Sequence, residues 1–172
     1  MSLYLIAVLR AVHVLTASFW LGANILNGFF LVPALRDAGP AGGQVSRQLV
    51  QVRRMPLVVN IAAVLVLVSG GFLIWNASGG LTPEWFGSRF GILISIGATA
   101  ALVSAIHGQL VTGPTAARMG RVAAQAQAAG GPPSPETLAE IGGLQRRLGS
   151  AARLGAVLNA VAAVLMASAR YW

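Results

Sequence analysis

Four long apolar stretches, separated by polar or glycine- and proline-rich segments, dominate the chain. They cover roughly residues 3–31, 56–75, 90–111 and 154–169. A helix needs about 20 mainly apolar residues to cross the hydrocarbon of a bilayer, and each stretch approaches or exceeds that length. Pro33 and Pro114 follow the first and third stretches and predict where those helices end. The pattern therefore predicts an all-α integral membrane four-helix bundle, built as a single transmembrane domain over residues 1–172.

The segments between the apolar stretches predict turns and one further helical unit. Residues 37–43 are rich in glycine and proline, which is typical of a turn. Residues 115–129 are rich in alanine and predict a helix that leaves the membrane, broken by the glycines and prolines of 130–133. Ser134, Pro135 and Glu136 then resemble the cap and first turn of a new helix. We expect a cytoplasmic helical hairpin over about 115–153, between spans three and four.

Composition and charge predict how the bundle is oriented. Only 9% of the 172 residues are charged and 56% are hydrophobic, with a mean hydropathy of +0.73, whereas soluble domains carry about 25% charged residues. All twelve basic residues are arginines, and most lie between spans one and two or between spans three and four. By the positive-inside rule these connections are cytoplasmic and both termini are outside. The net charge of +8 is then a topology signal that also attracts anionic lipids, and not a sign of nucleic-acid binding.

Three further expectations follow from the sequence. The first apolar stretch is longer than the core of a signal peptide and lacks a small-residue cleavage site, so we expect it to be retained. Arginine, alanine and glycine are abundant and lysine is absent, which is typical of a bacterium with a GC-rich genome. We expect the protein to lie in the plasma (inner) membrane.

His13 and His107 are the only histidines, and both lie inside apolar stretches. An ionisable side chain within a membrane span is a functional-site hypothesis by default. The chain has no cysteine and four acids in all, so imidazole is nearly the only strong metal ligand that it offers. Counted from Pro33 and Pro114 at 1.5 Å per residue, the two histidines differ by ~20 Å in depth. We therefore expect two separate sites and not a shared pair of ligands.

The site around His13 is predicted to bind a b-type haem. His13 would supply an axial nitrogen, and Arg10, on the same helix face at i, i+3, would pair with a propionate. Met166 would supply the second ligand, and Gly70 and Gly71 would let the porphyrin approach a helix. The alternative is that His13 only bonds a neighbouring serine or threonine while Arg10 extends to the outer interface.

The site around His107 is predicted to hold a haem or a quinone head group, with asparagine side chains as hydrogen-bonding walls. The alternative is that these side chains only tie helices together through hydrogen bonds within the membrane. The asparagines of this inner layer come from three of the four spans: Asn24, Asn27, Asn60 and Asn159.

Two sequence runs resemble small membrane proteins of the HemJ-type protoporphyrinogen oxidase and CopD-like copper-resistance families. The first run extends from His13 through Trp20 and Gly22, and the second joins Arg53-Arg54-Met55 to Ser69-Gly70-Gly71. The resemblance implies a four-helix membrane protein that binds haem or handles copper. HemJ-type proteins carry a lysine in the third span and this chain has none, so the resemblance implies haem binding more than protoporphyrinogen oxidation.

The sequence thus predicts a membrane-embedded b-type haem protein that serves electron transfer or a membrane redox reaction, with a quinone or a membrane redox partner. Two other functions stay open. The chain could be a non-catalytic accessory subunit of a larger membrane complex, as a homo- or hetero-oligomer whose histidines only tie helices together. It could also handle copper, bound by His13 or His107. Whether the chain is an enzyme is left open.

Overall fold

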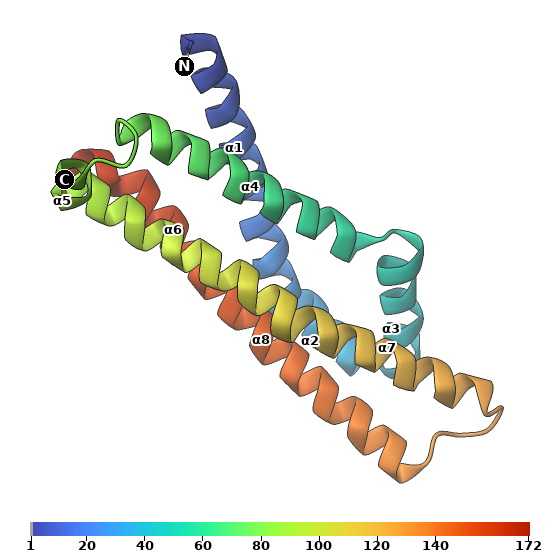
Figure 1. The fold of residues 1–172 in the computed structure, drawn as a ribbon. Helices are drawn as coiled ribbons and strands as arrows, with labels where there is room; N and C mark the ends of the chain where they lie inside the picture. Colours follow the sequence, from blue (N-terminus) through green and yellow to red (C-terminus); the bar gives the residue numbers. More distant parts are fainter. Residues whose placement is uncertain (1) are drawn as a thin grey trace.

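The computed structural model describes residues 2–172, and every regular element in that range is a helix (Figure 1). Four continuous helical segments are long and apolar enough to cross a membrane: Leu3–Asp37, Met55–Ala77, Arg89–Ala128 and Pro135–Tyr171. These segments contain the predicted spans and confirm the all-α membrane architecture.

In chain order the elements are α1 (Leu3–Ile25), the π-helix η1 (Leu26–Leu31), α2 (Val32–Asp37), α3 (Gly39–Arg47), the π-helix η2 (Gln48–Val52), α4 (Met55–Ala77), α5 (Pro83–Gly87), α6 (Arg89–His107), the π-helix η3 (Gly108–Thr112), α7 (Gly113–Ala128), α8 (Pro135–Ser168) and the 3₁₀ turn η4 (Ala169–Tyr171).

The prediction that Pro33 and Pro114 end their helices is wrong. Both helices pass the proline and continue, the first as α2 and the third as α7. A π-helical turn precedes each proline, and the Val32 N–H at the end of η1 donates to the Asn27 carbonyl, five residues back. This change of hydrogen-bond register lets the helix accommodate a residue that cannot donate a backbone hydrogen bond.

The turn predicted over residues 37–43 is also shorter than expected, because most of that segment is helix α3. The reversal takes place at Gly39, whose φ of +56° is a left-handed conformation that glycine adopts without a steric penalty. α3 then folds back so closely on α2 that a Cβ at Gly42 would lie 1.8 Å from the carbonyl oxygen of Leu35. The glycines therefore permit a close helix–helix contact and do not form an open loop.

The helical hairpin after the third span is confirmed. α7 ends at Ala128, and α8 begins at Pro135 after Ser134, whose hydroxyl accepts a hydrogen bond from the Thr137 N–H at 3.2 Å. Hydrogen bonds from the backbone and from Ser134 hold the pKa of Glu136 below its ordinary value. The two helices are joined by an ion pair between Arg118 and Glu140 at 2.7 Å. α8 runs on without interruption from this hairpin into the fourth apolar stretch.

The bundle consists of two helix pairs that meet where α1 crosses α8. α1 packs mainly on α4, and α6 packs mainly on α8; Figure 1 shows the N-terminal half of α1 extending away from the α6–α8 pair. At the crossing, a Cβ on Gly28 would lie 2.9 Å from the backbone carbon of Ala152 and from the backbone nitrogen of Arg153. The backbones approach this closely only because residue 28 has no side chain.

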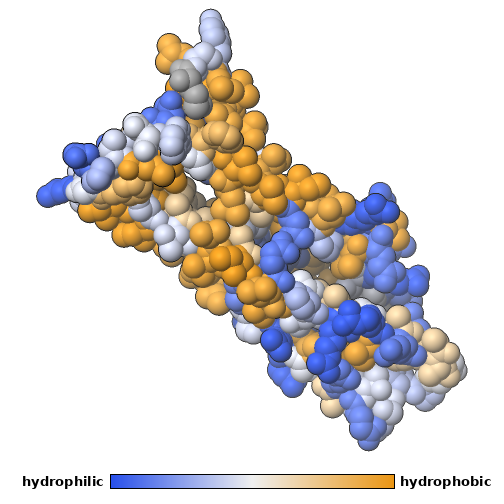
Figure 2. Space-filling model, viewed as in Figure 1, coloured by the Kyte–Doolittle hydropathy of each residue, from blue (hydrophilic) through white to orange (hydrophobic). Residues whose placement is uncertain are grey.

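One large side chain fills the centre of the bundle. Trp20 of α1 is 6% exposed and lies among small residues of the other three spans, including Ala63, Ala101 and Ala162. The outward surface of α1 and α4 is mostly apolar, whereas hydrophilic residues gather at the end that carries α3 and α7 (Figure 2). A core built from one indole and many alanines suits helices that pack in lipid, where van der Waals contact replaces the hydrophobic effect.

Candidate functional site

His13 lies half-buried in α1 with its imidazole directed at α4. Its Nδ1 atom is 3.1 Å from the carbonyl oxygen of Val66 and 3.2 Å from Oγ of Ser69. The Ser69 hydroxyl donates to the carbonyl of Leu65 in its own helix, so its lone pairs are free to face the histidine. The structure thus joins His13 to the Ser69-Gly70 segment of α4.

These contacts select one tautomer of His13. A carbonyl oxygen can only accept a hydrogen bond, so Nδ1 carries the proton and donates it to Val66 and Ser69. Nε2 then holds the lone pair, and none of the hydrogen bonds within the described residues uses it. An imidazole whose Nδ1–H is held by a carbonyl and whose Nε2 is available has the arrangement found in metal-ligating histidines.

Gly70 is required by the position of the imidazole. A Cβ at Gly70 would lie 2.9 Å from Cε1 of His13, closer than such atoms approach one another, whereas a Cβ at Gly71 would meet nothing within 4 Å. The space above Gly70, which the sequence assigns to a porphyrin, is therefore taken by the ring of His13 itself. Gly71 keeps an open surface.

We expect Gly70→Ala to displace the His13 imidazole from Val66 and Ser69, since the new methyl group and the ring cannot occupy the same space. The expected cost in stability is about 1–3 kcal/mol, as for other overpacked sites. Gly71→Ala is the matched control, because it makes the same change one residue away in open space. Unfolding of both variants in mixed micelles, followed by circular dichroism, measures the difference; equal stability of the two variants would contradict this geometry.

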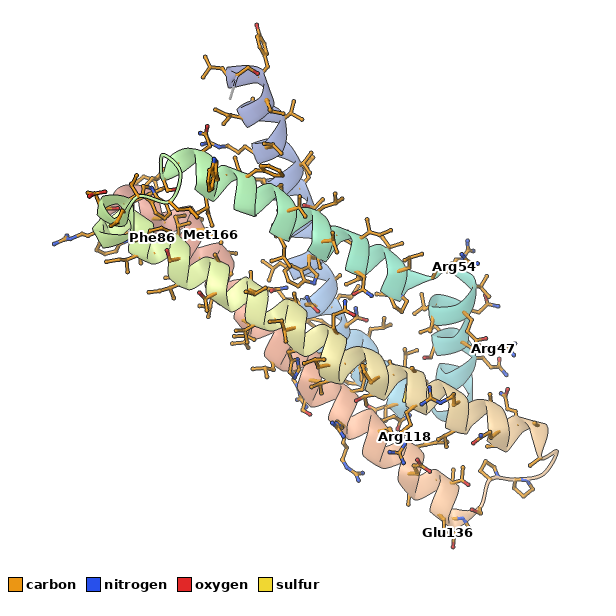
Figure 3. The ribbon with its side chains drawn as sticks, viewed as in Figure 1. Arg47, Arg54, Phe86, Arg118, Glu136 and Met166 are labelled. Carbon is orange, nitrogen blue, oxygen red and sulfur yellow. The ribbon has the colours of Figure 1, made fainter. Side chains whose placement is uncertain are left out.

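The structure does not bring the other two residues of the predicted haem site into direct contact with His13. Arg10 is exposed one turn before His13 on the same helix, and within the described chain it makes no ion pair. Met166 packs on the other helix pair, where its Cγ would lie 3.0 Å from a Cβ at Gly97 of α6. Figure 3 shows Met166 toward the α5 end of the molecule. A role for Met166 in packing is thus directly visible.

The asparagines predicted around His107 divide into separate local contacts. Asn27 donates to the carbonyl of Ala23 in its own helix at 2.8 Å. Asn60 of α4 accepts a hydrogen bond from Gln109 at 2.9 Å, which links α4 to the end of the third span. Asn24 lies beside Gly155 of α8, where its Oδ1 would be 3.7 Å from a Cβ. Gln109 was missed by the sequence analysis, although it is a rare amide near the end of an apolar stretch.

Asn159 has an unusual environment. It is 5% exposed, and neither its side-chain nitrogen nor its oxygen has a hydrogen-bond partner among the described residues. One turn earlier on α8, the Gly155 carbonyl accepts a hydrogen bond from Ser104 of α6 at 3.3 Å. An amide left without partners in an apolar core costs about 1–3 kcal/mol. A polar group placed beside Asn159 in the bundle centre would therefore gain hydrogen bonds that this side chain now lacks.

His107 is half-buried at the end of α6, and within residues 2–172 its side chain makes no hydrogen bond to another residue. The levels of the two histidines can be compared along α4. His13 contacts Val66 and Ser69 of α4, whereas Gln109, two residues after His107, donates to Asn60 of α4. At 1.5 Å per residue these contacts lie roughly 9–14 Å apart along α4. The histidines thus occupy different levels, but the separation is smaller than the ~20 Å counted from prolines that do not end their helices.

No group of three or more His, Asp or Glu side chains among residues 2–172 is placed to hold a metal ion. A protein-built copper or zinc site usually draws on three or four such ligands. A haem brings four nitrogens of its own and asks the protein for only one or two, which a single oriented histidine can provide.

Comparison with known proteins identifies a family. A family model described as predicted integral membrane protein, DUF2269, matches residues 7–168, a range that includes both histidines and nearly all of the four spanning helices. No curated protein and no solved structure matches the chain. The family description names neither a HemJ-type nor a CopD-like protein, so a cofactor must be argued from the site. The chain belongs to the DUF2269 family of predicted integral membrane proteins.

Proposed function

We propose that the chain binds a b-type haem in the membrane, with Nε2 of His13 as an axial ligand, and serves electron transfer or a membrane redox reaction. The observation that carries the proposal is the hydrogen bond from Nδ1 of His13 to the Val66 carbonyl. It fixes the tautomer and the ring orientation that ligation by Nε2 requires. Bound haem would supply one-electron chemistry that the side chains of this protein lack.

One charged residue near His13 suits the propionate groups of a haem. Arg10, which forms no ion pair among residues 2–172, lies one turn before His13 on the same helix face. Guanidinium groups bind carboxylates such as propionates well. Arg10 is therefore proposed as a residue that orients the haem and not as a ligand.

The absorption spectrum of the full chain, purified in mild detergent from cells supplied with haem precursors, tests this function. We expect a Soret band and a b-type reduced-minus-oxidised spectrum. A folded, colourless protein would overturn the proposal and favour the alternative, in which His13 only ties α1 to α4 within an accessory subunit. Copper determined on the same sample, purified without chelator, tests the copper hypothesis.

We also propose that α3 and the α7–α8 hairpin lie on the cytoplasmic side of the plasma membrane, with both termini outside. Arg47, Arg54 and Arg118 all lie at one end of the molecule (Figure 3), and arginine-rich connections are retained on the cytoplasmic side. α5, with Glu84, lies between α4 and α6 at the opposite end of these spans.

Single-cysteine labelling tests this orientation, because the natural chain contains no cysteine. In intact cells, a membrane-impermeant maleimide is expected to label Glu84→Cys in α5 and to leave Gly131→Cys in the hairpin unlabelled. Gly131→Cys should react only after the cells are opened. The opposite labelling pattern would contradict the proposed topology.

A further inference from the structure

An open cavity of about 570 Å³ is lined mainly by the α3–η2 segment and Arg53, with Gln127 of α7 at its border. Its lining contains two arginines, Arg47 and Arg53, three glutamines, Gln44, Gln48 and Gln127, and two apolar residues, Val45 and Leu49. The volume falls within the range of small-molecule sites, about 300–1,000 Å³. Most such sites are lined mainly by apolar groups, whereas five of the seven side chains here are polar or charged, which suits a ligand with a polar group.

The charges of Arg47 and Arg53 are not neutralised by the protein. The chain has only four acids, and two of them are engaged elsewhere: Asp37 pairs with Arg36 at 2.8 Å, and Glu140 pairs with Arg118. Within residues 2–172, no ion pair forms at Arg47 or Arg53. The cavity therefore presents two guanidinium groups and three amides without a nearby carboxylate in its lining.

We propose that this cavity binds the phosphate group of an anionic molecule, either the head group of an anionic lipid or a soluble phosphate ester. Guanidinium groups present paired N–H donors that match phosphate oxygens, and the glutamine amides add neutral donors. Arg53 lies two residues before the apolar helix α4 begins at Met55, so a phosphate bound there would lie close to the end of a spanning helix. Basic clusters beside a span are the usual recognition elements for anionic lipids.

The test compares two charge-matched double variants of the full chain. Arg47→Gln with Arg53→Gln removes both cavity charges. Arg121→Gln with Arg147→Gln removes the same number of exposed charges from α7 and α8, outside the cavity lining. Native mass spectrometry of protein released from phosphatidylglycerol or phosphatidylcholine nanodiscs measures the lipid retained, and glycerol 3-phosphate is added as a soluble competitor.

We expect the natural chain and the control variant to retain phosphatidylglycerol in preference to phosphatidylcholine, and the cavity variant to bind it at least about tenfold more weakly. Competition by glycerol 3-phosphate would show that a soluble phosphate ester also enters the cavity; failure to compete would identify the lipid as the ligand. Equal loss in both double variants, or no preference for the anionic lipid, would overturn the proposal. If the cavity variant does not fold, Arg47→Gln alone gives the same comparison, with Arg121→Gln as its control.

Discussion

Gly28→Val is expected to separate η1, the continuation of α1, from α8 and to destabilise the bundle by about 1–3 kcal/mol or more. The new Cβ would lie 2.9 Å from backbone atoms of both Ala152 and Arg153. Backbone atoms in the middle of α8 cannot rotate aside as the end of a flexible side chain can. The two helix pairs meet at this crossing, so the strain falls on the contact that makes the four spans one bundle.

Gly22→Val is the matched control, because it makes the same change earlier in α1 where a Cβ meets nothing within 4 Å. It carries a similar intrinsic cost for a β-branched residue in a helix. Unfolding of both variants in mixed micelles, followed by circular dichroism, gives the difference in free energy. If Gly28→Val is as stable as Gly22→Val, the crossing of α1 and α8 is not as close as the structure has it.

His13→Ala is expected to lose haem while the protein stays folded. Replacing a partner that merely orients a ligating residue already lowers metal affinity by about 10–100-fold, so removing the ligand itself should lower haem affinity by at least that factor. The hydrogen bonds lost to Val66 and Ser69 cost less, because hydrogen bonds between membrane helices average about 0.6 kcal/mol. Haem content and stability are therefore expected to respond to very different extents.

Two further variants separate ligation from helix pairing. Ser69→Ala removes one acceptor of the His13 Nδ1–H and leaves the Val66 carbonyl in place, so it should retain haem with reduced affinity. His107→Ala removes the other histidine of the chain and should leave the His13 spectrum unchanged. Loss of the Soret band in His107→Ala, with His13→Ala unaffected, would assign the haem to the inner histidine instead.

The spans and the hairpin could be predicted from the sequence because long apolar runs and the Ser134-Pro135-Glu136 start signal are decisive by themselves. The continuation of the helices through Pro33 and Pro114 could not be predicted, since it depends on π-helical turns that have no known residue pattern. The α3 helix was missed for a related reason. Its glycine content is typical of a turn, but the absence of a side chain at Gly42 allows α3 to contact α2 closely.

The sequence assigned Gly70 to the same site as His13, and the structure brings these two residues into contact. Their proximity follows from the length and direction of the first two spans. The direction in which Met166 points does not, because a span that is apolar on most faces has no strong pattern to fix its rotation. Packing against Gly97 decides that orientation. For the same reason the sequence could not separate the buried Asn159 from the exposed Asn60.

The most direct test of the central claim is a haemin titration of the purified full chain in lipid nanodiscs, followed in the Soret region. Ligation by Nε2 of His13 predicts saturation at one haem per chain, with a spectrum that His13→Ala abolishes and His107→Ala preserves. A folded chain that gives no saturable Soret change, or one whose titration is the same in His13→Ala, would contradict the account.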